Sequence, residues 1–189
     1  MSSLTVQNIQ GSASSSNTIN VASGHVLVQP GMVLQVIQGN TSAVATYSIA
    51  AFGLSSSILS ATITPKFATS KILITGQISG AADSRNHAFW ITLHRGSTNI
   101  GHGDAGGSRR LCHSGFAQFI DGSQGECLGH GTINFLDSPA TTSATTYNVL
   151  LSHNSGSSQN FHVNRSDQDG DTGDRPRTMS TLTLMEIAQ

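Results

Sequence analysis

The clearest strand pattern of the chain lies in its C-terminal segment, Asn134–Gln189, which reads NFLDSPATTSATTYNVLLSHNSGSSQNFHVNRSDQDGDTGDRPRTMSTLTLMEIAQ. It contains three short runs rich in β-branched and aromatic residues, separated by Ser, Gly, Asn and Asp: Thr145–His153, Asn160–Asn164 and Met179–Ile187. Runs of this length that are bounded by turn formers and lack helical periodicity predict strands. Because the last run stays apolar up to Ile187, we expect it to lie inside a sheet.

Seven further runs of this kind follow the turn signal at Pro30-Gly31. No window predicts an amphipathic helix of three turns. About ten strands at spacings of roughly 8–12 residues predict an all-β fold, an antiparallel β-sandwich with jelly-roll connections. The seven earlier runs are Met32–Gln38, Ala45–Phe52, Ile58–Thr64, Lys71–Ser79, His87–Arg95, Leu111–Ile120 and Glu126–Leu136.

Composition narrows the possible partners. Charged residues make up 10% of the 189 positions and the formal net charge is -1, so the chain lacks the basic surface typical of nucleic-acid binding. It has no run of eighteen apolar residues and no signal peptide at its start, so we expect synthesis in the cytoplasm without membrane insertion. In that compartment Cys112 and Cys127 should be reduced, although a disulfide between neighbouring strands is an alternative.

The first thirty residues differ from the rest. They hold a few apolar residues around the flexible spacer GSASSSN, too few for a core of their own. We therefore divide the chain into an N-terminal docking arm, residues 1–30, and a β-sandwich head, residues 31–189. A frayed tail is the alternative interpretation. The apolar residues expected to dock are Leu4, Val6, Ile9, Ile19 and Val21.

Two of the predicted strands are apolar on both faces, at Ile72–Ile74 and at Phe89–Leu93. A strand of this kind must be covered on both sides. In a two-layer sandwich one face of each sheet meets water, so part of this surface should contact another subunit. The pattern predicts a homo-oligomer and does not distinguish two subunits from three.

The best metal candidate is the acidic cluster Asp167, Asp169 and Asp171, whose alternate spacing matches the opening of a calcium loop. The match ends there, because Thr172 and Thr178 stand where such a loop needs Gly and Glu. Nearby arginines could instead neutralise the cluster as exposed ion pairs. Ca²⁺ is thus a possible ligand, and otherwise we expect no cofactor.

Catalytic motifs are missing from the sequence. It contains no G-x-S-x-G, HExxH, His-x-His or Cys-x-x-Cys motif. The Gly-rich segment Gly103–Arg110 lacks the Lys-Ser/Thr of a phosphate-binding loop, so it is interpreted as a connection between strands. We therefore expect a protein that is not an enzyme.

Four segments together resemble a known class of proteins: LHRGSTNIGHGDAGGSRR, NFLDSPATTSATTYNV, NRSDQDGD and TLTLMEIAQ. In this order they resemble small all-β virion proteins of tailed bacteriophages, particularly marine ones, which are usually described as tail-fibre or structural proteins. The resemblance spans roughly residues 31–189. It implies a virion component and a homotrimer.

These observations leave two functional hypotheses. The first is a short trimeric tail fibre whose arm docks on the tail or baseplate and whose head contacts the host surface, possibly a glycan. The second is a trimeric capsid decoration protein that stabilises the head shell. Recognition usually lies in loops on a rigid sandwich, here the exposed connections Gly96–Arg110 and Asn164–Arg177. The expected receptor-binding residues are Asn99, His102, Asp104, Arg109, Arg110, Asp174 and Arg175.

Overall fold

A computed structural model of the chain describes residues 21, 23, 25, 27–83, 88–117 and 128–189. This part of the chain contains strands and no helix, and therefore no helix long and apolar enough to cross a membrane. The strands are β1 (Val33–Thr41), β2 (Ala45–Ile49), β3 (Leu59–Ile63), β4 (Lys71–Ala82), β5 (Ala88–Arg95), β6 (Thr98–Ile100), β7 (Ser114–Ala117), β8 (Gly129–Asp137), β9 (Thr145–His153), β10 (Gln159–Val163) and β11 (Ser180–Ile187).

The strands pair in a nested order. β1 pairs with β11, β2 with β10, β3 with β9, β4 with β8 and β5 with β7, all antiparallel. The first half of the chain therefore runs back along the second half as one long ribbon, with β6 near its tip. Rolling such a ribbon produces two sheets in which strands distant in sequence become neighbours.

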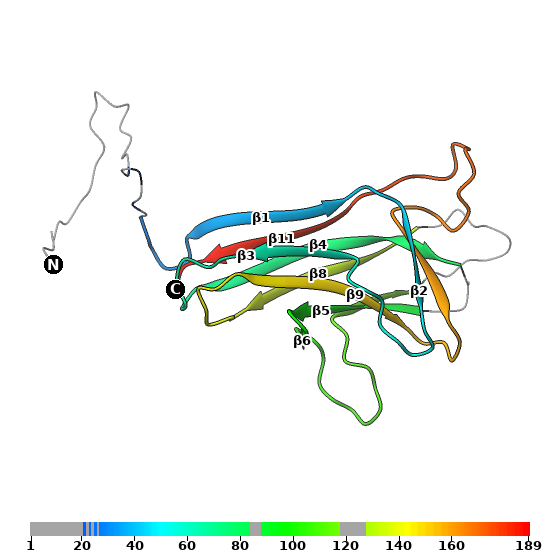
Figure 1. Cartoon of the computed structure of the whole chain (residues 1–189), viewed down its shortest axis with the longest axis horizontal. Helices are drawn as coiled ribbons and strands as arrows, with labels where there is room; N and C mark the ends of the chain where they lie inside the picture. The colour runs from blue at the N-terminus through cyan, green and yellow to red at the C-terminus, as the bar shows by residue number, and fades with distance from the viewer. Residues whose placement is uncertain (1–20, 22, 24, 26, 84–87, 118–127) are drawn as a thin grey trace, which may run out of the picture.

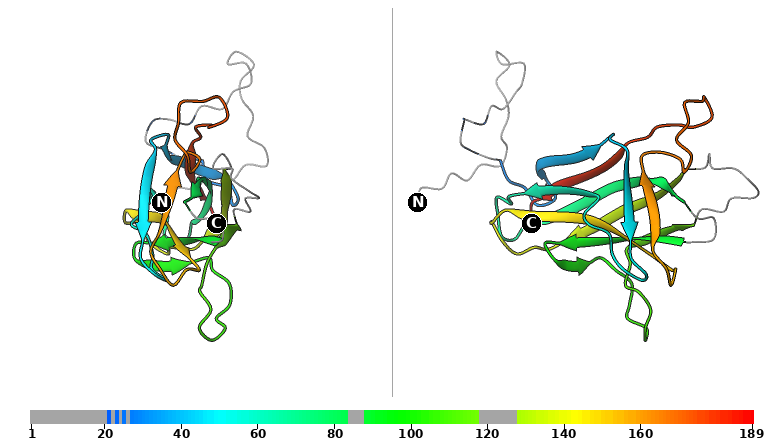
Figure 2. Two further views of the ribbon diagram at one scale, coloured as in Figure 1. Left: turned by 90° about the vertical axis from the view of Figure 1, so that its right-hand side faces the viewer. Right: turned by 45° about the vertical axis from the view of Figure 1, so that its right-hand side comes forward.

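The two sheets pack face to face (Figures 1 and 2). The larger sheet has the order β1-β11-β4-β10-β2, with β8 on the other edge of β4. The smaller sheet has the order β3-β9-β5-β6, with β7 beside β5. Without β2 and β10, the orders β1-β11-β4-β8 and β3-β9-β5-β7 are those of an eight-stranded jelly roll. The prediction of an all-β antiparallel jelly-roll sandwich is therefore confirmed.

The core lies between the sheets and follows the period of two expected for strands. In β11 the residues Leu182 and Leu184 are fully buried, and in β5 the same holds for Ile91 and Leu93. Each such side chain contributes roughly 1.5–3 kcal/mol by leaving water. The aromatic part of the core includes Phe89 and Phe161, whose ring centroids are 5.1 Å apart, and Tyr147.

A polar network joins the two sheets at one end. Asp137, the last residue of β8, accepts a 2.7 Å hydrogen bond from the Tyr147 hydroxyl and forms a 2.9 Å salt bridge with Arg95. Burial, followed by the hydrogen bond to Asp137, raises the pKa of Tyr147 far above its ordinary value. Because the three residues come from β8 of the larger sheet and from β9 and β5 of the smaller one, this network links the two layers.

A second buried carboxylate fixes the connection between β3 and β4. Glu186 in β11 accepts hydrogen bonds from Gln35 Nε2 at 2.6 Å and from the Lys66 and Phe67 amides at 2.8 and 3.3 Å. Burial by itself would raise the pKa of Glu186, but these hydrogen bonds outweigh it and lower the pKa. The ionised carboxylate therefore stabilises the folded state.

The outer face of the larger sheet carries an apolar row. Val36, Met185, Leu73 and Leu136 are successive cross-strand partners on β1, β11, β4 and β8. The two ends of the row are open to solvent, since Val36 is 54% and Leu136 47% exposed. The outward position of Leu73 agrees with the two-sided apolar pattern of β4.

The predicted strands match ten of the eleven observed strands, with ends that differ by a few residues. The prediction was wrong at Gly96–Arg110, which was expected to be one exposed connection. Gly96, with φ of 59°, forms a two-residue turn with Ser97, and Arg95 pairs with Thr98 across it. Glycine accepts this positive φ without steric cost, so β5 and β6 form a tight hairpin.

Candidate functional site

The outer face of the smaller sheet carries the candidate site. β5 alternates between inward residues of the core and the outward residues Trp90, Thr92 and His94. Trp90 is the only tryptophan of the chain. It lies opposite Gly115 of β7, where an added Cβ would be 2.6 Å from the indole Cδ1. Glycine at this position therefore leaves the space that the indole occupies.

A second aromatic side chain reaches this face from the connection between β2 and β3. Phe52 is 57% exposed and has a φ of 53°. For a bulky residue this left-handed conformation is strained, and strain of this kind is concentrated at functional sites. The Phe52 amide donates a 3.3 Å hydrogen bond to the Ser155 carbonyl, which helps to hold the residue in place.

The base of the Phe52 loop is held by a buried histidine. His153 Nε2 lies 3.1 and 3.0 Å from the carbonyl oxygens of Ile49 and Ala50, and its Nδ1 lies 3.0 Å from the Ser155 amide. Carbonyls accept and the amide donates, so the ring is neutral with its proton on Nε2. His153 is fully buried, and its role is to anchor the loop that carries Phe52.

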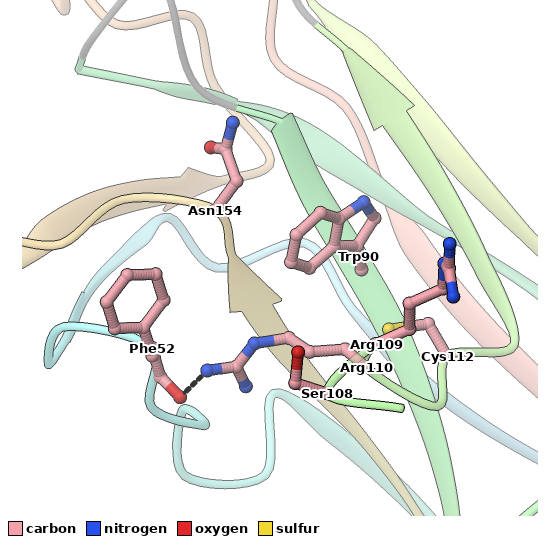
Figure 3. Close-up of a pocket in the computed structure, with 7 residues that line it drawn as sticks. All are labelled: Phe52, Trp90, Ser108, Arg109, Arg110, Cys112 and Asn154. Carbon is pink, nitrogen blue, oxygen red and sulfur yellow. Dashed lines mark hydrogen bonds between the residues drawn. The ribbon is translucent and has the colours of Figure 1, made fainter. Parts of the chain in front are cut away.

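Together these elements form an aromatic groove with a cavity volume of about 480 Å³. This volume lies within the range of roughly 300–1,000 Å³ that is usual for ligand sites. Phe52 and Trp90 stand on two sides of the groove, and Arg110 extends between them (Figure 3). The residues that line the groove are Phe52, Trp90, Ser108, Arg109, Arg110, Cys112 and Asn154.

The groove is cationic. Arg110 donates a hydrogen bond to the Phe52 carbonyl, and its guanidinium carbon lies 5.8 Å from the centroid of the Phe52 ring. Arg109 donates a 3.0 Å hydrogen bond to the Gly106 carbonyl. None of the described residues that line the groove is acidic. Two aromatic side chains beside two arginines suit a ligand with a flat apolar face and acceptor or anionic groups.

Cys112 lies at the inner side of this groove as a free, half-buried thiol. Burial raises the pKa of the Cys112 thiol, and the Ser152 hydroxyl and the Arg110 guanidinium oppose that rise in part. The thiol is therefore protonated at neutral pH, which argues against a role as nucleophile. Cys127, the other member of the disulfide alternative, lies outside the described residues.

The structure brings some predicted receptor-binding residues together and separates others. Arg109 and Arg110 line the aromatic groove, and Asn99 on β6 lines a smaller cavity next to it. Asp174 and Arg175 belong to the connection between β10 and β11, which projects from the opposite side of the sandwich (Figures 1 and 2). His102 and Asp104 are exposed in the connection that carries the two groove arginines.

The three carboxylates of the predicted calcium loop have different surroundings. Asp167 Oδ1 lies 3.3 Å from His162 Nε2, and Asp169 forms a salt bridge with Arg177. Asp171 is exposed. Within the described ranges no three His, Cys, Asp or Glu side chains are grouped closely enough to hold a metal ion. Ca²⁺ at this loop stays a prediction, and the ion pair of Asp169 agrees with the alternative of neutralisation by arginine.

Most of the predicted docking arm lies outside the residues that the structure describes. Leu4, Val6, Ile9 and Ile19 lie outside the described residues, whereas Val21 is described and is 47% exposed. The first strand starts at Val33. The division at residue 30 stays a prediction.

Sequence reasoning missed Phe52, Trp90 and Asn154 as site residues. A signal existed for Trp90, since an aromatic on the outward face of a half-buried strand is unusual. Phe52 and Asn154 gave no such signal, because they reach the groove from separate connections that only the folded chain brings together. A turn signal, Gly96-Ser97, also pointed to the missed β6 hairpin.

Comparisons with known proteins give little further guidance. No protein-family model matches the chain, and no curated protein is similar to it. Among solved structures, a chain of the structure of infectious bursal disease virus Gt strain is similar with a TM-score of 0.48 and 10% sequence identity. The similarity covers 91% of this chain and 42% of that chain, so this protein spans less than half of the neighbour's length. Likeness at this level supports no functional inference, and the fold assignment rests on the strand order.

Proposed function

We propose that this protein is a structural component of a virus particle, a short trimeric tail fibre of a tailed bacteriophage whose head binds a host-surface glycan. The observation that carries the binding role is the aromatic groove, where a strained Phe52 stands opposite the only tryptophan beside two arginines. Aromatic faces stack on the apolar faces of sugar rings, and guanidinium groups bind carboxylates and phosphates. An acidic polysaccharide satisfies both.

The virion assignment has separate support. The four sequence segments resemble phage structural proteins, and jelly rolls are frequent in viral capsid and lectin domains. Since one fold serves many functions, the binding role rests on the groove and not on the fold. In this proposal residues 1–30 attach the head to the tail, and the protein acts by binding, without catalysis, a cofactor or nucleic acid.

Affinity electrophoresis of the full chain in gels that contain alginate, an acidic polysaccharide, or dextran, a neutral one, tests the binding role. We expect alginate to retard migration more than dextran, and added salt to weaken the effect because the arginines are screened. Trp90→Ala should weaken binding by about tenfold or more, the scale expected for an aromatic anchor.

Phe67→Ala is the matched control, since Phe67 is another exposed aromatic residue and lies between β3 and β4, away from the groove. It should migrate like the wild type in every gel. If neither polysaccharide retards the wild type, or if Trp90→Ala binds as well as Phe67→Ala, the groove is not a glycan site.

The homotrimer, which the tail-fibre proposal shares with the alternative of a capsid decoration protein, is supported by the apolar row on the outer face of the larger sheet. Such a row is unusual on an isolated subunit and suits a surface that is covered in an assembly. We propose that a second copy of this chain covers it in the trimer. The row is uncharged from Val36 to Leu136, so like copies can meet there without charge repulsion.

Light scattering after size-exclusion chromatography tests this contact. The wild type should elute as a trimer, and Leu73→Glu as a monomer with an unchanged circular dichroism spectrum, because the new carboxylate would be buried in the interface. Thr75→Glu is the matched control one row away on β4. A monomeric wild type, or a trimeric Leu73→Glu variant, would exclude the row as the interface.

A further inference from the structure

A second cavity, which we call the polar cavity, lies beside the aromatic groove and shares Arg110 and Cys112 with it. Its volume is about 290 Å³. Its lining includes His94 on β5, Asn99 on β6 and Ser152 on β9, and also Thr92 on β5, whose hydroxyl already donates a 3.4 Å hydrogen bond to the Leu150 carbonyl. His94 and Asn99 are direct cross-strand partners in the β5-β6 hairpin.

Three of these side chains have a buried polar atom for which the described part of the chain supplies no hydrogen-bond partner: His94 Nε2, Asn99 Oδ1 and Ser152 Oγ. The exposed fraction is 9% for His94 and 0% for Ser152. Ser152 Oγ lies beside the Cys112 thiol, which is at best a weak hydrogen-bonding group. Buried polar atoms in folded proteins nearly always have partners. Three such atoms around one cavity therefore indicate a site that binds a ligand able to form these hydrogen bonds.

The remaining hydrogen bonds show what the cavity lacks. His94 Nδ1 lies 3.3 Å from the Ser97 carbonyl, which only accepts, so Nδ1 carries a proton, and in this tautomer Nε2 is an acceptor. Asn99 Nδ2 donates a 2.8 Å hydrogen bond to the Leu111 carbonyl, which leaves Oδ1 as the free acceptor. The Ser152 hydroxyl can donate or accept. The cavity thus offers two acceptors and one hydroxyl, and requires a ligand that donates.

The free acceptors of the polar cavity favour a neutral polyol over an anion, although Arg110 also lines the cavity. A carboxylate or phosphate would face Nε2 and Oδ1 acceptor to acceptor, whereas sugar hydroxyls can donate to both. Arg110 stands at the boundary of the two cavities, where its guanidinium can meet an acidic group placed in the groove. The two cavities therefore differ in the chemistry that they select.

We propose that the polar cavity is a second subsite of the glycan site and takes the hydroxyl groups of a neutral sugar next to an acidic sugar bound in the aromatic groove. This inference rests on the proposed glycan-binding function and specifies it. The preferred ligand is a heteropolysaccharide in which acidic and neutral residues are adjacent.

The test uses the full chain and three probes: a disaccharide of glucuronic acid and glucose, methyl glucuronide and methyl glucoside. Since Trp90 is the only tryptophan, its fluorescence reports occupancy of the groove. The disaccharide should bind the wild type at least about tenfold more tightly than methyl glucuronide, the gain expected from hydrogen bonds that satisfy buried groups. Asn99→Ala and Ser152→Ala should each lose part of this gain while methyl glucuronide binds as before.

Asn134→Ala is the matched control, because Asn134 lies on the outer face of β8 in the other sheet. It should behave like the wild type with all three probes. Nuclear magnetic resonance on the unmutated protein supplies a second measurement that does not depend on the folding of the variants. Methyl glucoside should shift the side-chain amide signals of Asn99 and leave those of Asn134 in place.

The outcomes separate the two proposals. Suppose that methyl glucuronide binds and that the Asn99→Ala and Ser152→Ala variants bind the disaccharide as tightly as the wild type does. The polar cavity then holds only solvent, and the subsite is refuted while the groove proposal stands. If methyl glucoside does not shift Asn99, the subsite is refuted as well. If none of the probes changes the fluorescence of Trp90 while methyl glucoside shifts Asn99, the cavity binds polyols and the groove proposal fails.

Discussion

Asn164 follows β10 and connects it by side-chain hydrogen bonds to the end of β1, to the segment between β1 and β2 and to the start of β11. Its replacement by alanine should destabilise the fold strongly. The residue is fully buried and follows β10 with a φ of 62°. Its Nδ2 donates 2.8 and 2.9 Å hydrogen bonds to the carbonyls of Thr41, the last residue of β1, and of Ala43, between β1 and β2. Its Oδ1 accepts a 2.8 Å hydrogen bond from Ser180 Oγ at the start of β11.

The magnitude follows from what each partner loses. Ser180 is fully buried, so its hydroxyl loses this acceptor without replacement, at a cost of about 1–3 kcal/mol. Thr41 is half-buried and Ala43 exposed, so water can restore much of their bonding. Alanine in the left-handed region adds about 1 kcal/mol, a strain that asparagine tolerates better. We expect Asn164→Ala to lose about 2–4 kcal/mol of unfolding free energy.

Asn164→Gly separates the two contributions. Glycine lacks the same side-chain hydrogen bonds but adopts a positive φ freely, so this variant should be about 1 kcal/mol more stable than Asn164→Ala. Urea unfolding at one protein concentration, followed by Trp90 fluorescence and circular dichroism, measures all three proteins. An alanine variant as stable as the wild type, or a glycine variant less stable than alanine, would refute the reasoning.

Three other predictions follow from the same contacts. The carboxylate of Glu186 has a lowered pKa, so the stability that it contributes is present above pH 4.5 and is lost as the pH falls through the folded-state pKa. Glu186→Gln should therefore be less stable than the wild type by about 1–3 kcal/mol at neutral pH. A stability difference that persists in strong acid would contradict this. Tyr147→Phe should cost about 1–2 kcal/mol in urea unfolding, because Asp137 loses one buried donor and keeps its arginine; an unchanged midpoint would show that the hydroxyl is dispensable. Gly115→Ala should displace the indole of Trp90, whose Cδ1 would lie 2.6 Å from the new Cβ. We expect a shifted fluorescence maximum and weaker alginate binding with an unchanged circular dichroism spectrum, and unaltered fluorescence would contradict the prediction.

Part of the candidate site was accessible from sequence. Arg109 and Arg110 were identified because they close a Gly-rich connection between strands, and both line the groove. Trp90 was placed in a strand that is apolar on both faces, and in the structure it lies on the outer face and lines the groove. Phe52 was expected at the end of a strand. In the folded chain it lies beyond β2, in a left-handed conformation that no local pattern indicates.

The fold class and the position of most strands could be predicted from local sequence patterns. Alternating apolar residues and the turn formers between them act over a few residues, so they can be read along the chain. The pairing of the strands as a nested ribbon and the contacts of Phe52, Arg110 and Asn154 around Trp90 became visible in the folded chain alone. These contacts join residues dozens of positions apart, and they are selected by the burial of the whole core rather than by any local preference.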